Sequence, residues 1–346
     1  MVMNSRSIRF NRFILALTSV FLIVGCKSDQ ETKQRSYTLV EGPVFGTYYR
    51  IKIDSEIDFK PKIDSIFQVI NEAANSYVGE SEITTFNQTG QLKNPSPTFL
   101  GMIKEAQHFQ QITNGYFEPA IYPIIKVWRF EEQGASMQVD SSELKELLKL
   151  VPMHENIAIS DTLIKATKQG VKIDLSAMGE GYAIEGIHQV LSEAQVANYM
   201  IEIGGEIFAH GKNEKGNPWT IGIEDPSKAG QNSYENIITK IELVDQGIST
   251  SGSYRKFYTD EQGHKYPHII DPITGYPVKH HMVSVSVKGL SPLVADIYAT
   301  ACMTMGIEKA KEFITSDSDV QAFMVYYEKD SLKTWNSPNF YKTPTQ

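Results

Sequence analysis

Residues 174–183 read DLSAMGEGYA, and this stretch indicates how the surrounding chain folds. The pattern is typical of a strand that passes through a turn of small residues into a helix. Beyond the turn, apolar residues recur at helical spacing and predict the buried face of that helix: Ala183, Ile187, Val190 and Leu191. Exposed backbone N–H groups at such a junction would suit an anionic ligand, although glycine-rich turns of this kind also occur without one.

Outward from this stretch, helical and extended patterns alternate irregularly. Helical spacing or helix-start residues occur at 61–75, at Ser96-Pro97 and from Asp140 to Glu143. Alternating apolar residues predict a hairpin over 199–211 and strands over 219–223, 237–243 and 283–287. Adjacent strands in this mixed order predict an α+β fold, with mixed sheets and packed helices in one large domain of two closely packed lobes.

The first 26 residues predict export and lipid attachment. Three arginines precede an apolar stretch, 13–24, which is too short to span a bilayer because a span takes about 20 apolar residues. Two aliphatic residues followed by Gly25-Cys26 resemble a lipobox, in which the cysteine becomes the lipidated first residue. An ordinary cleaved signal that happens to end in cysteine is the alternative.

The predicted organisation is a signal peptide over 1–25, a lipidated tether over 26–36 and a main domain over 37–346. The tether is polar and carries no apolar pattern. Acyl chains on Cys26 would form a stable anchor, because each buried CH₂ contributes about 0.8 kcal/mol. We therefore expect a membrane-anchored lipoprotein outside the cytoplasm, on the periplasmic side of the inner or the outer membrane.

Composition excludes some classes of partner and of fold. The formal net charge is −8 and no basic run follows the predicted signal peptide, so nucleic acid is a poor partner. The only other cysteine, Cys302, lies in an apolar helical stretch and predicts a buried thiol rather than a disulfide. The sequence also lacks a Walker loop, a dinucleotide fingerprint, a zinc-protease helix and a Gly-x-Ser-x-Gly elbow.

Three polar stretches each allow a structural and a functional interpretation. Gly204-Gly205-Glu206 predicts a tight turn or a close backbone approach. The glycines, hydroxyls and arginine of 247–255 could line a phosphate site or form an ordinary loop. His268 precedes an Asp-Pro turn; such a histidine is more often structural, yet the usual histidine pKa near 6.5 would suit a general base.

Ser291-Pro292 predicts the start of a helix that carries Asp296 and Thr300 four residues apart, and therefore on one face. The predicted inward stripe lies beside this oxygen pair and comprises Val294, Ile297, Ala301 and Met305. Two hard oxygen donors in this position could bind Mg²⁺ or Ca²⁺. The alternative is an acidic residue favoured by the helix dipole, with the hydroxyl there by chance.

Taken in order, these stretches resemble the FAD:protein FMN transferase family, also called the ApbE family. The resemblance runs from Gly42-Pro43-Val44-Phe45-Gly46-Thr47 to Lys333-Thr334-Trp335, nearly the whole mature chain. It includes Ser76-Tyr77, Ser81-Glu82-Ile83, Phe86-Asn87 and Gly115-Tyr116-Phe117-Glu118-Pro119. No single motif is decisive, but many of them occur in register.

The resemblance implies that FMN is transferred from FAD to a threonine or serine hydroxyl of a target protein through a phosphoester, with release of AMP. Mg²⁺ would be held by the Asp296 carboxylate, the Thr300 hydroxyl and the Ala177 carbonyl. His268 would take the proton of the incoming hydroxyl. The flavin contacts of the family would fall on eight residues: Phe45, Tyr77, Tyr116, Phe117, Glu118, Asp174, Glu180 and Ile270.

Three of these residues depart from the commonest family pattern. Phe45 stands where many members have methionine, Glu118 where aspartate is common, and Glu180 where many have lysine. The expected protein substrates are exported domains of membrane flavoproteins of the redox-pump type. Two alternatives remain open: an FAD pyrophosphatase in which water takes the place of the acceptor hydroxyl, and a lipoprotein that binds flavin without chemistry.

Overall fold

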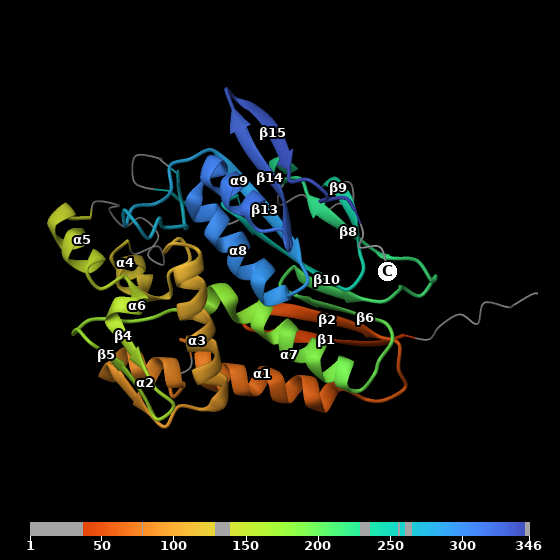
Figure 1. Ribbon diagram of the computed structural model, residues 1–346, viewed down its shortest axis with the longest axis horizontal. Helices are drawn as coiled ribbons and strands as arrows, with labels where there is room; N and C mark the ends of the chain where they lie inside the picture. The colour runs from red at the N-terminus through yellow and green to blue at the C-terminus, as the bar shows by residue number, and fades with distance from the viewer. Residues whose placement is uncertain are drawn as a thin grey trace, which may run out of the picture. The chain divides into compact units, whose positions relative to one another are not determined.

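The structure is a computed structural model that describes residues 37–342 apart from Val78, 129–138, 229–235, 255–256 and 260–264. These residues belong to one compact unit, Arg35–Gln346. The predicted signal peptide, the tether with Cys26, and Arg255 lie outside the described residues. Helices and antiparallel sheets follow one another in mixed order, which confirms the predicted α+β class (Figure 1).

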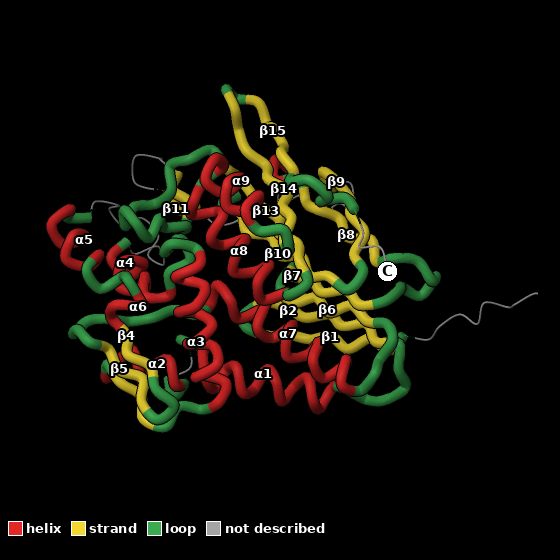
Figure 2. The backbone as a smooth tube through the Cα atoms, in the orientation of Figure 1, coloured by secondary structure: helices red, strands yellow, loops and turns green. Residues whose placement is uncertain are grey.

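An eight-stranded antiparallel sheet forms the centre of the fold, in the order β1-β2-β6-β7-β10-β13-β14-β15 (Figure 2). Its strands are β1 (Thr38–Val44), β2 (Thr47–Ile53), β6 (Tyr199–Ile203), β7 (Glu206–His210), β10 (Gln246–Gly252), β13 (Met282–Gly289), β14 (Val320–Glu328) and β15 (Ser331–Asn336). The strands β6 and β7 form the hairpin predicted over 199–211. The β13 strand is buried on both faces, which places it centrally.

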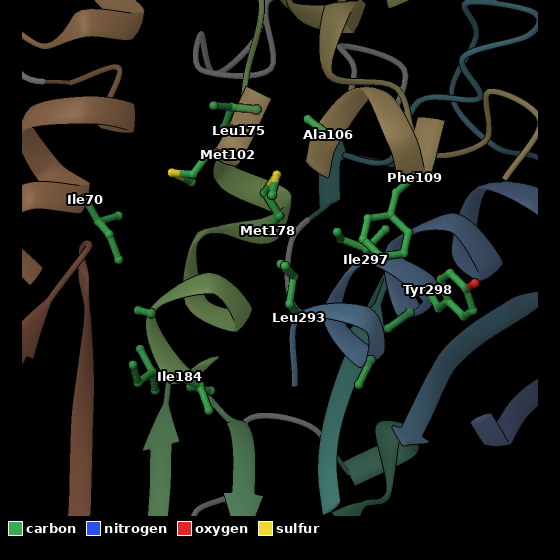
Figure 3. Close-up of a cluster of buried hydrophobic side chains, with 14 of the residues drawn as sticks. Ile70, Met102, Ala106, Phe109, Leu175, Met178, Ile184, Leu293, Ile297 and Tyr298 are labelled. Carbon is green, nitrogen blue, oxygen red and sulfur yellow. The ribbon is translucent and has the colours of Figure 1, made fainter. Parts of the chain in front are cut away.

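Helices cover one face of this sheet in two layers. Helices α7 (Gly179–Glu193) and α8 (Pro292–Met305) lie against the strands, and α1 (Lys60–Ala74) and α3 (Pro97–Ile112) pack outside α7, while α9 (Ile307–Ser316) packs on β14. Figure 3 shows part of this core, where Phe109 of α3 lies beside Ile297 of α8 and Met102 of α3 lies toward Met178. No helix within the described residues is long and apolar enough to cross a membrane.

The far face of the sheet carries a smaller hydrophobic cluster. The antiparallel strands β8 (Trp219–Glu224) and β9 (Ile237–Leu243) pack there, joined by the short helix η3 (Pro226–Lys228) and 229–235. Phe340 from the C-terminal segment completes the cluster. Lys288 of β13 is also buried on this side, with its Nζ 5.6 Å from the centre of the Phe340 ring.

A second lobe contains the short elements between α1 and α7. Its three-stranded sheet has the order β3-β5-β4, and its helices surround a third cluster that includes Ile124, Trp128 and Ile270. The elements are α2 (Glu82–Thr89), β3 (Gln91–Lys93), η1 (Pro119–Ile121), α4 (Tyr122–Val127), α5 (Ser141–Leu148), α6 (Met153–Asn156), β4 (Ile157–Ile159), β5 (Leu163–Ala166) and η2 (Ser176–Met178), with the separate hairpin β11 (Phe257–Thr259) and β12 (Lys265–Pro267) nearby.

The predicted helix starts are confirmed by their capping bonds. Ser96 caps α3 by accepting a hydrogen bond from the Phe99 N–H, and Asp140 caps α5 by accepting one from the Ser142 N–H. Ser291 caps α8 in the same way. The prediction that Cys302 is a buried thiol is confirmed, and burial raises the pKa of this thiol.

Two local predictions are wrong. The residues before Ser176 do not form a strand: Ile173 bonds the side chain of Asn87 through both its N–H and its C=O, and the Asp174 N–H donates to the Pro119 carbonyl. Helix α8 has no single inward stripe, because it is buried on almost all sides between the sheet, α7 and α9. A helix in such a central position does not show one-sided amphipathicity.

Candidate active site

A cleft of about 900 Å³ lies where the β1–β2 turn, the β6–β7 turn, the start of α7 and helix α8 meet. Its volume falls within the range of about 300–1,000 Å³ that is common for small-molecule sites. It is lined by eleven of the predicted site residues: Phe45, Tyr116, Phe117, Glu118, Asp174, Ala177, Glu180, His268, Ile270, Asp296 and Thr300. Tyr77 does not line it; this side chain is 89% exposed beyond the end of α1.

Two tight turns form one edge of the cleft. Phe45 and Gly46 have φ angles of 49° and 78°, as expected for a type I′ hairpin turn. The Phe45 ring packs edge-on against the Phe67 ring, with 5.7 Å between the ring centres. Gly204 and Gly205 also have positive φ angles, and the Gly204 N–H donates to the Tyr48 carbonyl. The glycine pair therefore provides both a tight turn and a close approach to the neighbouring hairpin.

Asp296 of α8 is joined to the start of α7. Its Oδ2 accepts a 2.9 Å hydrogen bond from the Gly181 N–H, in the first turn of α7. A Cβ on residue 181 would lie 2.8 Å from the Cβ of Asp296, so glycine is needed for this approach. The anion expected at the junction of 174–183 is thus, in part, the carboxylate of the protein itself.

Asp296 is buried among other acidic groups. Ser249 donates to its Oδ1 at 3.2 Å, and the same hydroxyl lies 3.3 Å from Oε1 of Glu206. Burial raises the pKa of Asp296 well above its usual range, and the negative charges of Glu206 and Glu180 raise it further. A cation next to this carboxylate would relieve both effects.

The other two residues predicted to bind metal line the same cleft as Asp296. Thr300 lies one turn after Asp296, with its Oγ1 3.4 Å from Oγ of Ser251, and Ala177 belongs to η2, which packs against α8. An all-oxygen set of one carboxylate, one hydroxyl and one carbonyl suits Mg²⁺, which keeps several water or phosphate ligands. Nowhere in the described part of the chain do three His, Cys, Asp or Glu side chains group to hold an ion by themselves.

The lining of the cleft is strongly acidic. It contains seven carboxylates: Glu118, Asp174, Glu180, Glu202, Glu206, Glu224 and Asp296. Among the described residues that line the cleft there is no lysine or arginine. A ligand that carries phosphate groups would therefore meet repulsion here unless a cation accompanied it.

Glu118 differs from the other acidic residues because its carboxylate joins parts of the second lobe. Its oxygens accept hydrogen bonds from the Ala120 N–H, the Met153 N–H and the Gln110 side-chain amide. Burial nevertheless raises its pKa from an ordinary 4.5 to about 8, against the lowering effect of these bonds. Glu118 thus supports the cleft wall through bonds to η1, α6 and α3.

Apolar side chains also line the cleft. Phe117 and Ile270 are almost fully buried, and Tyr116 is partly buried against the main core. His268 lies beside them, partly buried, just before the turn in which Asp271 bonds the Ile273 N–H and the Thr274 hydroxyl. Aromatic rings next to a polar floor are suited to a ligand with both planar rings and charged groups.

Sequence reasoning did not select Glu206, Ser249, Glu202 or Glu224 as site residues. A signal existed for two of them. Glu206 follows a glycine pair, and the period of two in a strand places Ser249 and Ser251 on the same face of β10, the face that meets Asp296 and Thr300. Glu202 and Glu224 carried no such signal.

Comparison with known proteins identifies the family of this chain. The sequence model of the ApbE family matches residues 45–324. An FAD:protein FMN transferase of Vibrio cholerae is 31% identical over 336 residues, covering 95% of this chain and 97% of that protein, and one of Haemophilus influenzae is 30% identical over 344 residues, covering 95% and 96%. The solved structure of the flavin transferase ApbE from Vibrio cholerae superposes with a TM-score of 0.76 at 29% identity, covering 88% of this chain and 98% of that one. The chain therefore belongs to the ApbE family.

Proposed function

We propose that this protein is an FAD:protein FMN transferase, which joins the FMN part of FAD to a hydroxyl of a target protein and releases AMP. The activity printed for its relatives and the fold that it shares with them support this function. The observation that carries the proposal is the buried Asp296 in an acidic cleft that is also lined by aromatic side chains.

The charges in the cleft indicate that FAD binds together with a divalent cation. FAD brings a diphosphate into a lining that has seven acidic side chains and, among the described residues, no lysine or arginine. Burial keeps Glu118 largely protonated at neutral pH, but the other acidic groups would still repel the diphosphate, so binding needs positive charge between them. Asp296, Thr300 and the Ala177 carbonyl would hold Mg²⁺. When bound, Mg²⁺ would polarise the phosphorus and neutralise the charge that grows on the AMP leaving group.

The residues of the chain orient the reaction. The Gly181 N–H and the Ser249 hydroxyl fix the two oxygens of Asp296, which keeps this carboxylate directed into the cleft. Phe45, Tyr116 and Phe117 would contact the flavin or adenine ring and exclude water from one side. Such positioning supplies much of the catalysis in phosphoryl transfer.

His268 is the proposed general base. It lines the cleft, and no other histidine does so among the described residues. It would take the proton as the acceptor oxygen bonds to the FMN phosphorus and the bond from phosphorus to the AMP oxygen breaks. The proton then passes to solvent.

We also propose that Cys26 is lipidated and holds the enzyme on the outer side of a membrane. The apolar stretch 13–24 and Gly25-Cys26 support this assignment. The protein substrates would then be exported domains of membrane flavoproteins, which emerge on the same side.

The test is incubation of residues 27–346 with FAD, Mg²⁺ and candidate membrane flavoproteins, followed by mass spectrometry of the acceptor and measurement of AMP. We expect an FMN adduct on a threonine or serine and one AMP for each adduct. AMP with free FMN and no adduct would indicate FAD hydrolysis instead. Bound FAD that stays intact would indicate a flavin-binding lipoprotein without chemistry.

A further inference from the structure

Tyr116 is held in the cleft wall from two directions. Its carbonyl oxygen lies 2.6 Å from Oγ1 of Thr304, which is on α8, one turn beyond Thr300. Its hydroxyl accepts a hydrogen bond from the ammonium of Lys309, which is on α9. Lys309 itself is exposed and does not line the cleft.

The contact between the Lys309 ammonium and the Tyr116 hydroxyl leaves the faces of the tyrosine ring free to contact a ligand. The Lys309 Nζ lies 5.0 Å from the centre of the Tyr116 ring. A nitrogen at that distance above the middle of the ring would be out of hydrogen-bond reach of the hydroxyl. The ammonium therefore lies near the ring edge, beyond the oxygen, and does not cover a face. Tyr116 packs against the main core and also lines the cleft.

We propose that Lys309 is a positioning residue for FAD: by fixing the Tyr116 hydroxyl, it presents the ring of this tyrosine as a preset wall for one of the planar rings of FAD. The inference rests on the proposed function. Its physical basis is that a side chain already held in its bound rotamer loses less conformational entropy when the ligand binds. Because α8 carries Asp296 and Thr304, and α9 follows it directly, the ring is set relative to the proposed metal site.

A nearby lysine supplies the matched control. Lys311 lies on the same helix, two residues beyond Lys309, donates to Glu308 at 3.2 Å, and has its Nζ 5.3 Å from the centre of the Tyr326 ring. It thus has a similar charge, helix and aromatic neighbour, but its neighbour Tyr326, unlike Tyr116, does not line the cleft.

The experiment is a double-mutant cycle on the whole mature chain, with FAD affinity measured by flavin fluorescence and KM and kcat measured by AMP release. Lys309→Met and Tyr116→Phe should each weaken FAD binding and raise KM about three- to tenfold, the range expected for one hydrogen bond, with kcat unchanged. The double variant should be no worse than either single one. Lys311→Met should leave KM within about twofold, and Lys309→Arg should restore much of the affinity.

Three outcomes would overturn the inference. An effect of Lys309→Met that persists in full in the Tyr116→Phe background would mean that Lys309 acts directly on FAD or elsewhere. An equal effect of Lys311→Met would show that general charge or helix stability is responsible. If the wild type is active and Lys309→Met has an unchanged KM, the positioning role of Lys309 is refuted but the proposed function is not. A wild type that neither binds nor cleaves FAD would instead refute the proposed function, and this inference with it.

Discussion

Asp296 and Lys288 are both buried ionisable residues beside the eight-stranded sheet, Asp296 on α8 at one face and Lys288 on β13 facing the other. Asp296 is surrounded by further acidic residues and opens onto a cleft. Lys288 is enclosed, donates to the Lys342 carbonyl at 2.9 Å, and lies near the Phe340 ring. Desolvation disfavours the charged form of both groups.

The difference lies in what each charge can still bind. The Asp296 oxygens keep lone pairs directed to the cleft after accepting from Gly181 and Ser249, so a cation can complete the site. Lys288 has its partner within the fold, where its bond holds the C-terminal segment on β13. We infer that Asp296 is retained for function at a cost in stability, and that Lys288 acts on stability alone.

Replacing Asp296 should give the largest effect. Asp296→Asn keeps the shape but removes the charge that would hold Mg²⁺, so we expect transfer to fall by about a thousandfold or more. Without metal, the free energy of unfolding should rise by about 1 kcal/mol because repulsion from Glu206 and Glu180 is relieved. AMP release and denaturant unfolding measure the two quantities. Asp161→Asn, at an exposed position, is the control; full activity in Asp296→Asn would refute the metal assignment.

Glu118, unlike Asp296, has its hydrogen bonds satisfied inside the fold, and its effect on stability should depend on pH. Its pKa is raised to about 8 in the fold, above the ordinary 4.5, so its contribution to stability is complete below about pH 4.5 and is lost as the pH rises through about 8. The wild type should lose stability between pH 5 and 8, on the order of 3 kcal/mol at most. Glu118→Gln should flatten this slope in denaturant unfolding; equal slopes would contradict the assignment.

Lys288→Met should stabilise the fold and leave transfer unchanged. Burial lowers the pKa of Lys288 from an ordinary 10.5 to about 8, so below pH 8 the fold must accommodate a buried charge. We expect the free energy of unfolding of the variant to be higher by about 2 kcal/mol at pH 7, after allowing for the lost bond to Lys342. This gain in stability should fade as the pH rises from 8 to 10.5. Thermal unfolding of the variant and the wild type across this pH range measures the difference in stability. A loss of stability at pH 7 would mean that the bond outweighs the burial of the charge.

The smallest effect on chemistry is expected at Cys26, outside both sites. Cys26→Ala should keep kcat and KM of the purified protein within about twofold, because the described residues that line the cleft and form the core all lie beyond the predicted tether. In cells, the variant should move from the membrane to the soluble fraction and label its targets less. Membrane fractionation shows the first, and mass spectrometry of the targets shows the second. A variant still bound to membranes would refute the lipid anchor.

Local sequence patterns predicted the elements well because their causes are local. Ser96 and Asp140 cap helices through bonds to residues two or three positions away, and the alternating valines of 283–287 predicted the strand β13. Its burial does not alternate, because both faces of this central strand are covered. The strand expected before Ser176 was wrong because extended residues there bond Asn87 and Pro119, far away in sequence. Whether an extended segment joins a sheet depends on partners that its own pattern does not reveal.

The candidate site shows the same limit. Family motifs indicated eleven residues that the fold does gather in one cleft. Ser249 and Glu206 lay in stretches that the sequence marked as polar, but they were not chosen as site residues, because their link to Asp296 arises only when β10 and β7 pair beneath α8. Lys309 is 193 positions from Tyr116, and nothing in its neighbourhood marks it. Contacts made across the fold, rather than the motifs, complete the site.

The length of strand β1 helps to set how far from the membrane the cleft can reach an acceptor. Its seven residues run from Thr38, near the end of the predicted tether, to Val44, next to Phe45 in the cleft, a span of about 23 Å. The eleven tether residues 26–36 can extend by at most about 40 Å. The proposed anchor would thus confine the cleft to a shell about 60 Å deep above the bilayer, where the effective concentration of acceptors is high. An acceptor hydroxyl held farther from the membrane would be out of reach, whatever its sequence.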